Sequence, residues 1–258
     1  MGTAGRLELV ALQGVGRVEP GDDLAARVLR AAGESGIALA RGDVLVIAQK
    51  VVSKAEGRYA FLDEVMPSPR ARELAATCLK DPHVVELVLR ESRTVLRAVP
   101  NVLVVEDRRG LVLANAGIDQ SNVEPDASGR ARVLLLPEDP DASAKRLRQR
   151  IGERAGIEVG VIINDSIGRA WRLGTVGSCI GASGLPGLLD LRGTPDLYGR
   201  ALQTTETGFA DELAAAASFV MGQGGEGRPV ILIRGAVLPR TDGNARELLR
   251  PGNKDLFR

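Results

Sequence analysis

Short runs of Val, Ile and Leu recur along this sequence, separated by segments in which apolar residues have a helical spacing. Such runs, when polar or glycine-rich segments bound them, are typical of buried β-strands. We predict strands at Val44–Ala48, Val102–Val105, Val133–Leu136, Val159–Ile163 and Val230–Ile233. Strands that alternate with helices restrict the chain to folds that mix the two kinds of element.

Helix signals lie between these strands. We predict helices at Asp22–Ala32, Arg70–Leu79, Asp141–Ala155 and Ala210–Met221. In the second of them, Ser68 is a typical N-cap and Pro69 takes the first helical position. The turn Asp107–Gly110 predicts that Val102–Asn115 is a β-hairpin, which argues against a purely parallel doubly wound sheet. The predicted fold class is therefore α+β, a mixed sheet with helices.

The composition excludes several classes of protein. The 34 Lys and Arg nearly balance the 33 Asp and Glu, and one Trp, two Tyr and four Phe offer few stacking surfaces, so we expect no nucleic-acid partner. No segment approaches the ~20 apolar residues of a membrane helix, and the N-terminal residues lack a signal-peptide core. The cysteines, Cys78 and Cys179, have no zinc-site spacing. We expect a cytoplasmic protein without a membrane partner.

Five polar or glycine-rich stretches interrupt the pattern where a strand or helix ends. Functional sites in open α/β structures tend to lie in such segments. The stretches are Leu12–Gly16, Gln49–Gly57, Asn115–Asn122, Ile163–Trp171 and Met221–Arg228.

Two of these stretches are candidates for phosphate contacts. Glycines in Leu12–Gly16 would let backbone N–H groups approach a phosphate, although taken alone they are better explained by an ordinary turn. We expect Gln49–Gly57 to be a polar surface loop that carries Lys50 and Lys54, whose compact charges suit phosphate oxygens. A charged loop without function is the alternative. The sequence contains no Walker A motif, which excludes an ordinary P-loop.

The other three stretches carry oxygen ligands for a hard cation. Asp165 and Ser166 directly follow a predicted buried strand, an arrangement that recurs where Mg²⁺ is held near phosphates. Asp119 lies on a glycine-containing turn with amides, which a purely structural turn also explains. The glycines of Met221–Arg228 would let the backbone lie close to a bulky ligand, with Gln223 and Glu226 able to reach a metal. Oxygen ligands favour Mg²⁺ or Mn²⁺ over Zn²⁺.

Histidine and cysteine chemistry is not supported by the sequence. The single histidine, His83, follows Asp81-Pro82 at a predicted helix start, so we expect neither a His-based triad nor a histidine metal site. Cys78 lies in a helical pattern and is expected to be buried rather than nucleophilic.

A series of segments matches one family in order along the chain, roughly from residue 7 to 235. The segments are Gly14, Pro20–Asp23, Gly42–Val46, Val52–Gly57, Asn115–Asn122, Leu135–Ser143, Asp165–Arg169, Asp196–Arg200 and Asp211–Ala216. In these segments the chain resembles the coenzyme F420-0:L-glutamate ligases, the GTP-dependent γ-glutamyl ligases of F420 biosynthesis. One departure is Asn164-Asp165-Ser166, where the family pattern has Thr-Asp-Thr.

The resemblance implies a reaction and its participants. Members of this family join L-glutamate, and in some cases further γ-linked glutamates, to the carboxylate of coenzyme F420-0. They use GTP. Because a free carboxylate must be activated before it forms an amide, we expect an acyl phosphate intermediate and the release of GDP and phosphate. The resemblance also implies two divalent ions (Mg²⁺ or Mn²⁺), allows a monovalent cation such as K⁺, and points to a homodimer.

The resemblance further implies a two-lobed α+β fold within a single unit, 1–258. We expect the lobes to be interwoven, one formed by about 1–80 with 185–245 and the other by about 81–184. Because the chain stops at Arg258, we expect no C-terminal flavin-binding domain of the kind that some relatives carry.

Carried over residue by residue, the resemblance gives a set of site residues. The implied nucleotide contacts are Leu12, Gln13, Gly14, Val15, Ser53, Lys54, Asn122, Phe219, Val220, Met221, Gly222, Gln223, Gly224, Gly225 and Glu226. The implied metal ligands are Asp119, Asp165, Ser166 and Gln223. No protein side chain is expected to act as a nucleophile, so metal charge and positioning would supply the catalysis.

Two other functions fit the same sequence: a ligase that adds glutamate to a different acid, and a GTP-binding regulator without catalytic activity. Guanine and adenine specificity are not distinguished by the residues. The family assignment requires that the fold bring Asp119 and Asp165 together, and we expect no arginine to pair with them. We also expect Lys54 to be a surface residue.

Overall fold

A mixed five-stranded sheet forms the centre of the protein. The computed structural model describes residues 5–239 and 241–255. The strand order is β1–β12–β2–β8–β9, with bounds β1 (Glu8–Ala11), β12 (Val230–Arg234), β2 (Val44–Ala48), β8 (Gly160–Arg169) and β9 (Arg172–Ser183). Strands β2 and β8 run parallel, and the other neighbouring pairs run antiparallel. The predicted α+β class is confirmed.

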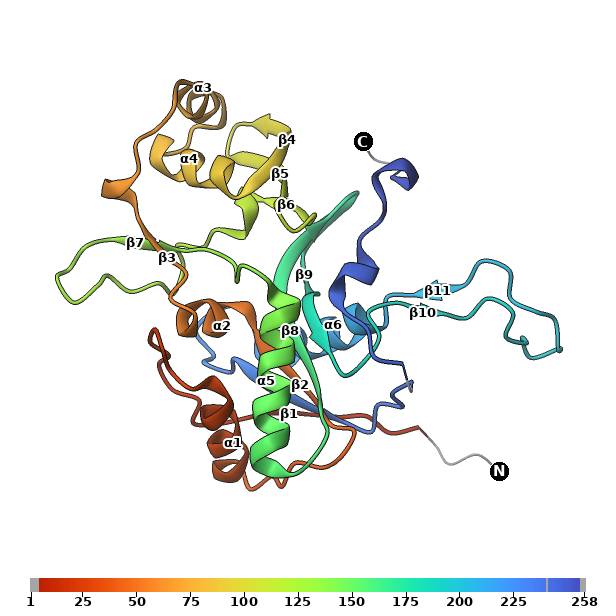
Figure 1. The fold of residues 1–258 in the computed structure, drawn as a ribbon. Coiled ribbons are helices and arrows are strands. Elements are labelled where there is room, and N and C mark those ends of the chain that lie inside the picture. Colours follow the sequence, from red (N-terminus) through yellow and green to blue (C-terminus); the bar gives the residue numbers. More distant parts are fainter. Residues whose placement is uncertain (1–4, 240, 256–258) are drawn as a thin grey trace.

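Helices cover both faces of this sheet, which explains the continuous apolar runs. Side chains alternate along β2, so Leu45 and Ile47 face one hydrophobic core while Val44 and Val46 face the other. The helices of the first face are α1 (Leu24–Glu34), α2 (Gln49–Ala55) and α5 (Pro140–Ala155), and the second face is covered by α6 (Phe209–Met221). Figure 1 shows α5 on one side of the sheet and α6 on the other.

A smaller core lies beside the main sheet. It contains two helices and a three-stranded antiparallel sheet: α3 (Pro69–Cys78), α4 (Pro82–Arg90), β4 (Ser92–Val99), β5 (Val102–Asp107) and β6 (Val112–Ala114). In Figure 1 these elements lie together above the main sheet. The predicted hairpin is confirmed, because β5 pairs with β6, and the buried Asp107 carboxylate accepts the backbone N–H groups of Arg109 and Leu111 in its turn.

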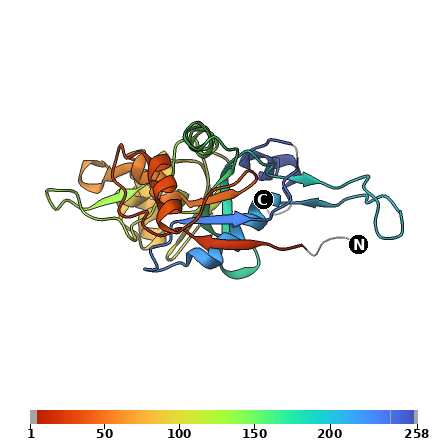
Figure 2. The same ribbon diagram turned by 90° about the horizontal axis from the view of Figure 1, so that it is seen from below.

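Two narrow ribbons and four short turns complete the fold. The ribbons are β3 (Tyr59–Phe61) with β7 (Arg132–Leu134), and β10 (Leu189–Asp190) with β11 (Glu206–Thr207). The turns are η1 (Leu62–Glu64), η2 (Asn115–Gly117), η3 (Ala245–Leu248) and η4 (Gly252–Lys254). The β10–β11 ribbon extends away from the body of the molecule (Figures 1 and 2). Within 5–239 and 241–255, no helix is long and apolar enough to cross a membrane.

The four predicted helices are confirmed to within two residues at each end, as α1, α3, α5 and α6. Cys78 is buried, as expected, and both cysteines are free thiols. The lobe boundaries at about 1–80 with 185–245 and about 81–184 remain a prediction.

Two sequence-based element assignments were wrong. Residues Gln49–Ala55 form helix α2 instead of a loop, and Val52 on that helix packs into the core. Strand β8 does not end at Ile163 but continues to Arg169, because β9 pairs with it along that whole length. Asp165 therefore lies inside a strand and not after one. The β7 strand is also shorter than predicted, ending at Leu134.

Candidate active site

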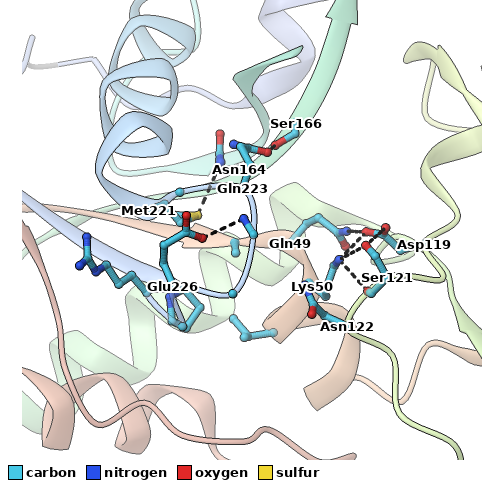
Figure 3. Close-up of a pocket in the computed structure, with 18 of the residues that line it drawn as sticks. Gln49, Lys50, Asp119, Ser121, Asn122, Asn164, Ser166, Met221, Gln223 and Glu226 are labelled. Atoms are coloured by element: carbon cyan, nitrogen blue, oxygen red, sulfur yellow. Dashed lines mark hydrogen bonds and ion pairs between the residues drawn. The ribbon is translucent and has the colours of Figure 1, made fainter. Parts of the chain in front are cut away.

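A pocket of about 570 Å³ opens where the carboxyl ends of β2 and β8 meet the end of α6. These two strands are parallel neighbours, with Ala48 opposite Asn164, so the residues that follow each of them reach the same edge of the sheet. The lining includes most of the expected site: Lys54, Asp119, Asn122, Asp165, Ser166 and Met221–Glu226. Figure 3 shows two groups of polar side chains in this pocket.

The first group surrounds Asp119. One carboxylate oxygen, Oδ2, accepts a hydrogen bond from Gln49 Nε2 at 3.1 Å and lies 3.1 Å from Lys50 Nζ. The other oxygen, Oδ1, accepts from Ser121 Oγ at 3.2 Å. The amide of Gln49 is oriented in turn, because its Oε1 accepts the buried Ser53 hydroxyl at 3.0 Å. Helix α2 thus holds the Asp119 carboxylate through two residues that the sequence analysis did not assign to metal binding.

The backbone near Asp119 is held by an unusual turn. Asn115, Ala116 and Gly117 in η2 have positive φ angles of 53°, 52° and 69°. Beyond this turn, the N–H and C=O groups of Asp119 both bond to the backbone of Leu134, at 2.9 Å each. The predicted turn therefore presents the Asp119 side chain from a fixed backbone.

The second group surrounds Asp165 on β8. The Ser166 N–H donates to Asp165 Oδ1 at 2.8 Å, and the Ser166 hydroxyl donates to Gln223 Oε1 at 2.5 Å. Gln223 Nε2 donates to Ser218 Oγ at 2.9 Å, so the amide oxygen of Gln223 is the atom that faces Ser166. Three of the four predicted metal ligands are therefore connected side by side.

Burial raises the pKa of the Asp165 carboxyl to about 6. The negative charge of Asp119 contributes to this increase as well, whereas the Ser166 N–H and the charge of Lys50 reduce it, and about 6 is the net result. A carboxylate that is desolvated and close to a second carboxylate is stabilised by a nearby cation. Asp119 and Asp165 thus lie within electrostatic reach of one another, and no arginine of the described ranges pairs with either, as expected. Lysine 50 does pair with Asp119, which the sequence did not indicate.

Asn164, directly before Asp165, is a further polar residue of the pocket. Its side chain is 3% exposed, its Nδ2 donates to Met221 Sδ at 3.9 Å, and its Oδ1 has no hydrogen-bond partner. The sequence analysis recognised this position only as a departure from the family pattern. Asn164 is buried because α6 packs against the sheet there. That helix begins 45 residues later in the sequence, so the burial has no local signal.

The glycine-rich segment after α6 forms one wall of the pocket. Gly222 and Gly227 have positive φ angles of 79° and 67°, which glycine adopts without strain. The Glu226 carboxylate accepts the N–H of Gly224 at 2.8 Å, and such backbone hydrogen bonds lower the pKa of Glu226. Glu226 therefore bonds within the glycine-rich segment, while the side chain of Gln223 is directed toward Ser166.

Lys54 differs from the expected surface lysine. Its side chain is only 9% exposed, and its Nζ lies 3.0 Å from Glu124 Oε2. Burial of Glu124 raises the pKa of its carboxyl, but the hydrogen bond from Lys54 helps to lower it, and the net effect is a lowered pKa. Lys54 is nevertheless a lining residue of the pocket, so its charge faces both Glu124 and the cavity.

Several expected nucleotide contacts lie outside the pocket lining, namely Leu12, Gln13, Gly14, Val15, Ser53, Phe219 and Val220. Leu12 and Val15 are core residues, and Ser53 is buried against Gln49. Phe219 is 91% exposed and belongs to the last turn of α6, not to a loop. A nucleotide contact by these residues remains a prediction. The lining residues to which sequence reasoning assigned no role include Gln49 and Arg228, whereas Lys50 was expected only as a candidate for phosphate contact.

The donors in the pocket fit a hard divalent cation. Among residues 5–239 and 241–255, no three His, Cys, Asp or Glu side chains are grouped to hold a metal by themselves. The donors are the carboxylates of Asp119 and Asp165 together with the neutral oxygens of Ser166 and Gln223. Mg²⁺ usually takes one or two carboxylates and receives its remaining ligands from waters and substrate phosphates. This donor set therefore fits Mg²⁺ or Mn²⁺ held jointly with a nucleotide.

Comparisons with known proteins identify the family of this chain. A family model described as F420-0:Gamma-glutamyl ligase matches residues 14–235. A Methanopyrus kandleri protein named coenzyme F420:L-glutamate ligase is 48% identical over 98% of this chain and 97% of its own length. Proteins of the same name from Methanothermobacter thermautotrophicus and Archaeoglobus fulgidus are 46% and 44% identical, over 98% of this chain and 99% and 97% of their lengths. The chain therefore belongs to the F420-0:γ-glutamyl ligase family and is a ligase.

Proposed function

We propose that this chain joins L-glutamate to the carboxylate of coenzyme F420-0 at the expense of GTP. An F420-0 carboxylate oxygen attacks the γ-phosphorus, the bond to the β-phosphate oxygen breaks, and GDP leaves. The glutamate amine then attacks the acyl carbon of the resulting acyl phosphate and loses a proton. Phosphate departs carrying one oxygen of the original carboxylate. Addition of further γ-linked glutamates would repeat the same two steps.

One observation carries this proposal. Two carboxylates from distant segments, Asp119 and Asp165, face a single pocket that a glycine-rich wall and two lysines also line. Activation of a carboxylate by a nucleoside triphosphate needs cation sites next to phosphate-binding groups, and it needs no protein nucleophile. The histidine of this chain is outside the pocket lining, and both cysteines are buried.

Each lining group has a role in this reaction. Asp119, Asp165, Ser166 and Gln223 would hold two divalent ions, Mg²⁺ or Mn²⁺, which when bound neutralise phosphate charge. Lys54 would contact phosphate oxygens as a point charge. Backbone N–H groups of Gly222–Gly225 would lie against the nucleotide. The use of GTP, a requirement for a monovalent cation such as K⁺, and a cytoplasmic location belong to the proposal as well.

The proposal is tested with purified protein, F420-0, L-glutamate and Mg²⁺ or Mn²⁺, with GTP or ATP in parallel. Mass spectrometry should detect the glutamylated product and glutamate-dependent GDP release. With ¹⁸O in the F420-0 carboxylate, the label should appear in the released phosphate. No GDP release would favour a GTP-binding regulator, and release with another acid only would favour a different glutamate ligase. Product without ¹⁸O transfer would exclude the acyl phosphate.

Replacing Lys54 by Met should raise the KM for GTP about tenfold or more, because the methionine keeps the buried stem but lacks the charge. It should also lower Tm slightly, since Glu124 then keeps only Arg17, whose Nε lies 3.6 Å away. Steady-state kinetics and calorimetry measure the two effects. Lys145→Met, on the exposed face of α5, is the control and should change neither quantity. A lower Tm with an unchanged KM would assign Lys54 a structural role only.

We also propose that the protein is a homodimer. The β10–β11 ribbon extends from the body and carries Leu197 and Tyr198, which are 98% and 83% exposed (Figure 2). Apolar side chains grouped on a protruding ribbon are typical of a surface that a partner covers. A second copy of the chain is the partner that the family resemblance implies.

The dimer is tested by light scattering after size-exclusion chromatography. The parent protein should elute with twice the chain mass, and Leu197→Glu should elute as a monomer because it places a charge in an apolar interface. Val237→Glu replaces another exposed apolar residue outside the ribbon and should stay dimeric. A monomeric parent, or a dimeric Leu197→Glu protein, would contradict this prediction.

A further inference from the structure

Lys50 lies against the carboxylate of Asp119, one of the predicted metal ligands. Its Nζ donates to the Ser121 carbonyl oxygen at 2.9 Å and to Ser121 Oγ at 3.1 Å, and it lies 3.1 Å from Asp119 Oδ2. The Lys50 side chain is 23% exposed and lines the pocket, although its Nζ is held by these three contacts. Figure 3 shows Lys50, Asp119 and Ser121 as one cluster.

The contacts of Asp119 differ in whether they are compatible with a bound cation. A neutral donor such as Gln49 is a common partner of a carboxylate that binds a metal, because it orients the carboxylate without adding charge. An ammonium group 3.1 Å from the same oxygen repels a divalent cation on that carboxylate. Lys50 and a metal therefore compete for Asp119, whereas Gln49 serves Asp119 in both states.

The two lysines of α2 are held differently. Lys54 pairs with Glu124, which is not among the predicted metal ligands. The Lys54 side chain is nearly buried. Lys50 pairs with a predicted ligand, and its flexible stem is partly exposed in the pocket lining, so it is able to turn from Asp119 toward the cavity. Anionic phosphate oxygens in that cavity would give its charge a new partner.

We propose that Lys50 is a counter-cation for Asp119 that weakens metal binding there until an anionic nucleotide phosphate is present to accept Lys50. This inference rests on the proposed function and adds a positioning residue to it. Its consequence is thermodynamic coupling: nucleotide and metal each increase the affinity of the protein for the other, and part of that coupling depends on Lys50.

Calorimetric titration of the full-length protein with Mn²⁺, with and without GDP, tests the proposal. Lys50→Met should bind Mn²⁺ about tenfold more tightly than the parent when GDP is absent, and GDP should strengthen its Mn²⁺ binding less than it does for the parent. Lys50→Arg keeps the charge and should keep most of the coupling. The matched control is Lys54→Met, which removes a charge from the same helix and pocket and should tighten Mn²⁺ binding much less.

A second measurement uses the unmodified sequence and does not depend on a variant folding. Acylation of lysines followed by mass spectrometry should find Lys50 protected in the metal-free protein, more reactive with Mn²⁺ alone, and protected again with Mn²⁺ and GDP. Lys145, exposed on α5, is the internal reference and should not respond.

The outcomes separate this inference from the function on which it rests. Mn²⁺ binding that is equal in Lys50→Met and the parent, or an equal gain in Lys54→Met, would overturn the role of Lys50 and leave the metal site intact. Loss of Mn²⁺ binding in Asp165→Asn but not in a surface variant supports the proposed metal site separately. A parent protein that binds no Mn²⁺ even with GDP would overturn both.

Discussion

Asp165→Asn should abolish turnover and remove the thermal stabilisation that Mn²⁺ or Mg²⁺ gives the protein. Asparagine keeps the shape of the side chain and can still accept the Ser166 N–H, which donates to Asp165 Oδ1 at 2.8 Å in the parent. Asparagine lacks the negative charge of the carboxylate. The predicted ligand set has only two carboxylates, so the divalent cation would lose half of the charge that binds it. A ligand that binds the folded state stabilises it by mass action, so loss of metal binding removes that stabilisation.

The metal-free Asp165→Asn protein should be as stable as the parent or more stable. In the folded parent the pKa of Asp165 is about 6, above its ordinary value of 3.8. The folded state therefore binds more protons than the unfolded state between these values, and this carboxyl reduces stability as the pH rises through that window. The full shift corresponds to up to about 3 kcal/mol. The advantage of Asp165→Asn should thus be small at pH 4 and greatest above pH 6.

Thermal unfolding at several pH values, with and without Mn²⁺, measures both effects, and the ligase assay measures turnover. Glu212→Gln, which removes one negative charge from the exposed face of α6, is the matched control and should retain activity and metal-dependent stabilisation. An Asp165→Asn protein that keeps full activity, or that still gains stability from Mn²⁺, would show that this carboxylate is not a metal ligand.

The sheet could be predicted because its central strands are buried on both faces. In β2, Val44 and Val46 pack on one core and Leu45 and Ile47 on the other, so the sequence contains a continuous apolar run. Helix α2 could not be predicted in the same way. It has only seven residues, and Gln49, Lys50 and Lys54 face a pocket while Val52 packs into the core. Over only seven residues, a loop and a helix that lines a pocket can show the same spacing of polar residues.

The extent of β8 depends on a partner strand. Residues Asp165–Arg169 carry no apolar run, and they are extended because β9 pairs with them, from Asp165 opposite Ser178 to Arg169 opposite Arg172. The local sequence identified Asp165 as a site residue but placed it after the strand. Its position inside a paired strand makes the carboxylate more rigid than a loop would.

The candidate site was predictable residue by residue only through the family resemblance. Local patterns indicated Asp119 and Asp165 as separate oxygen ligands, but their place in one pocket depends on the parallel pairing of Ala48 with Asn164 and on the bond from Gln49 to Asp119. Gln49 has no recognisable signature because its role is to orient Asp119, a residue 70 positions away. The burial of Lys54 depends in the same way on Glu124, also 70 positions distant. Such long-range partners are properties of the fold.

Gly177→Ala should destabilise the protein by about 1–3 kcal/mol and lower Tm by roughly 3 to 10 °C. Gly177 lies on β9 opposite Ser166, under helix α6. A Cβ atom at this position would lie 2.4 Å from Ser218 Cβ and 2.6 Å from the Ala214 carbonyl oxygen, both on α6. It would also lie 2.7 Å from Asn164 Oδ1, the unpartnered oxygen of the pocket.

The same substitution should weaken nucleotide and metal binding beyond its effect on stability, because relief of the clash requires α6 to move away from the sheet. Ser218 on α6 holds the amide of Gln223 by a 2.9 Å hydrogen bond, so displacement of the helix moves Gln223 away from Ser166. The KM for GTP and the affinity for Mn²⁺ should therefore both worsen at temperatures where the variant is still folded. Calorimetry and steady-state kinetics below Tm separate the two effects.

Gly168→Ala is the matched control for this prediction. Gly168 lies on the neighbouring strand β8, and a Cβ atom added there would meet no atom within 4 Å. The control should therefore leave Tm and the KM for GTP close to those of the parent. If Gly177→Ala were as stable and as active as Gly168→Ala, close contact between β9 and α6 would not be what positions the glycine-rich wall. If only its stability fell, the position of Gln223 would not depend on α6.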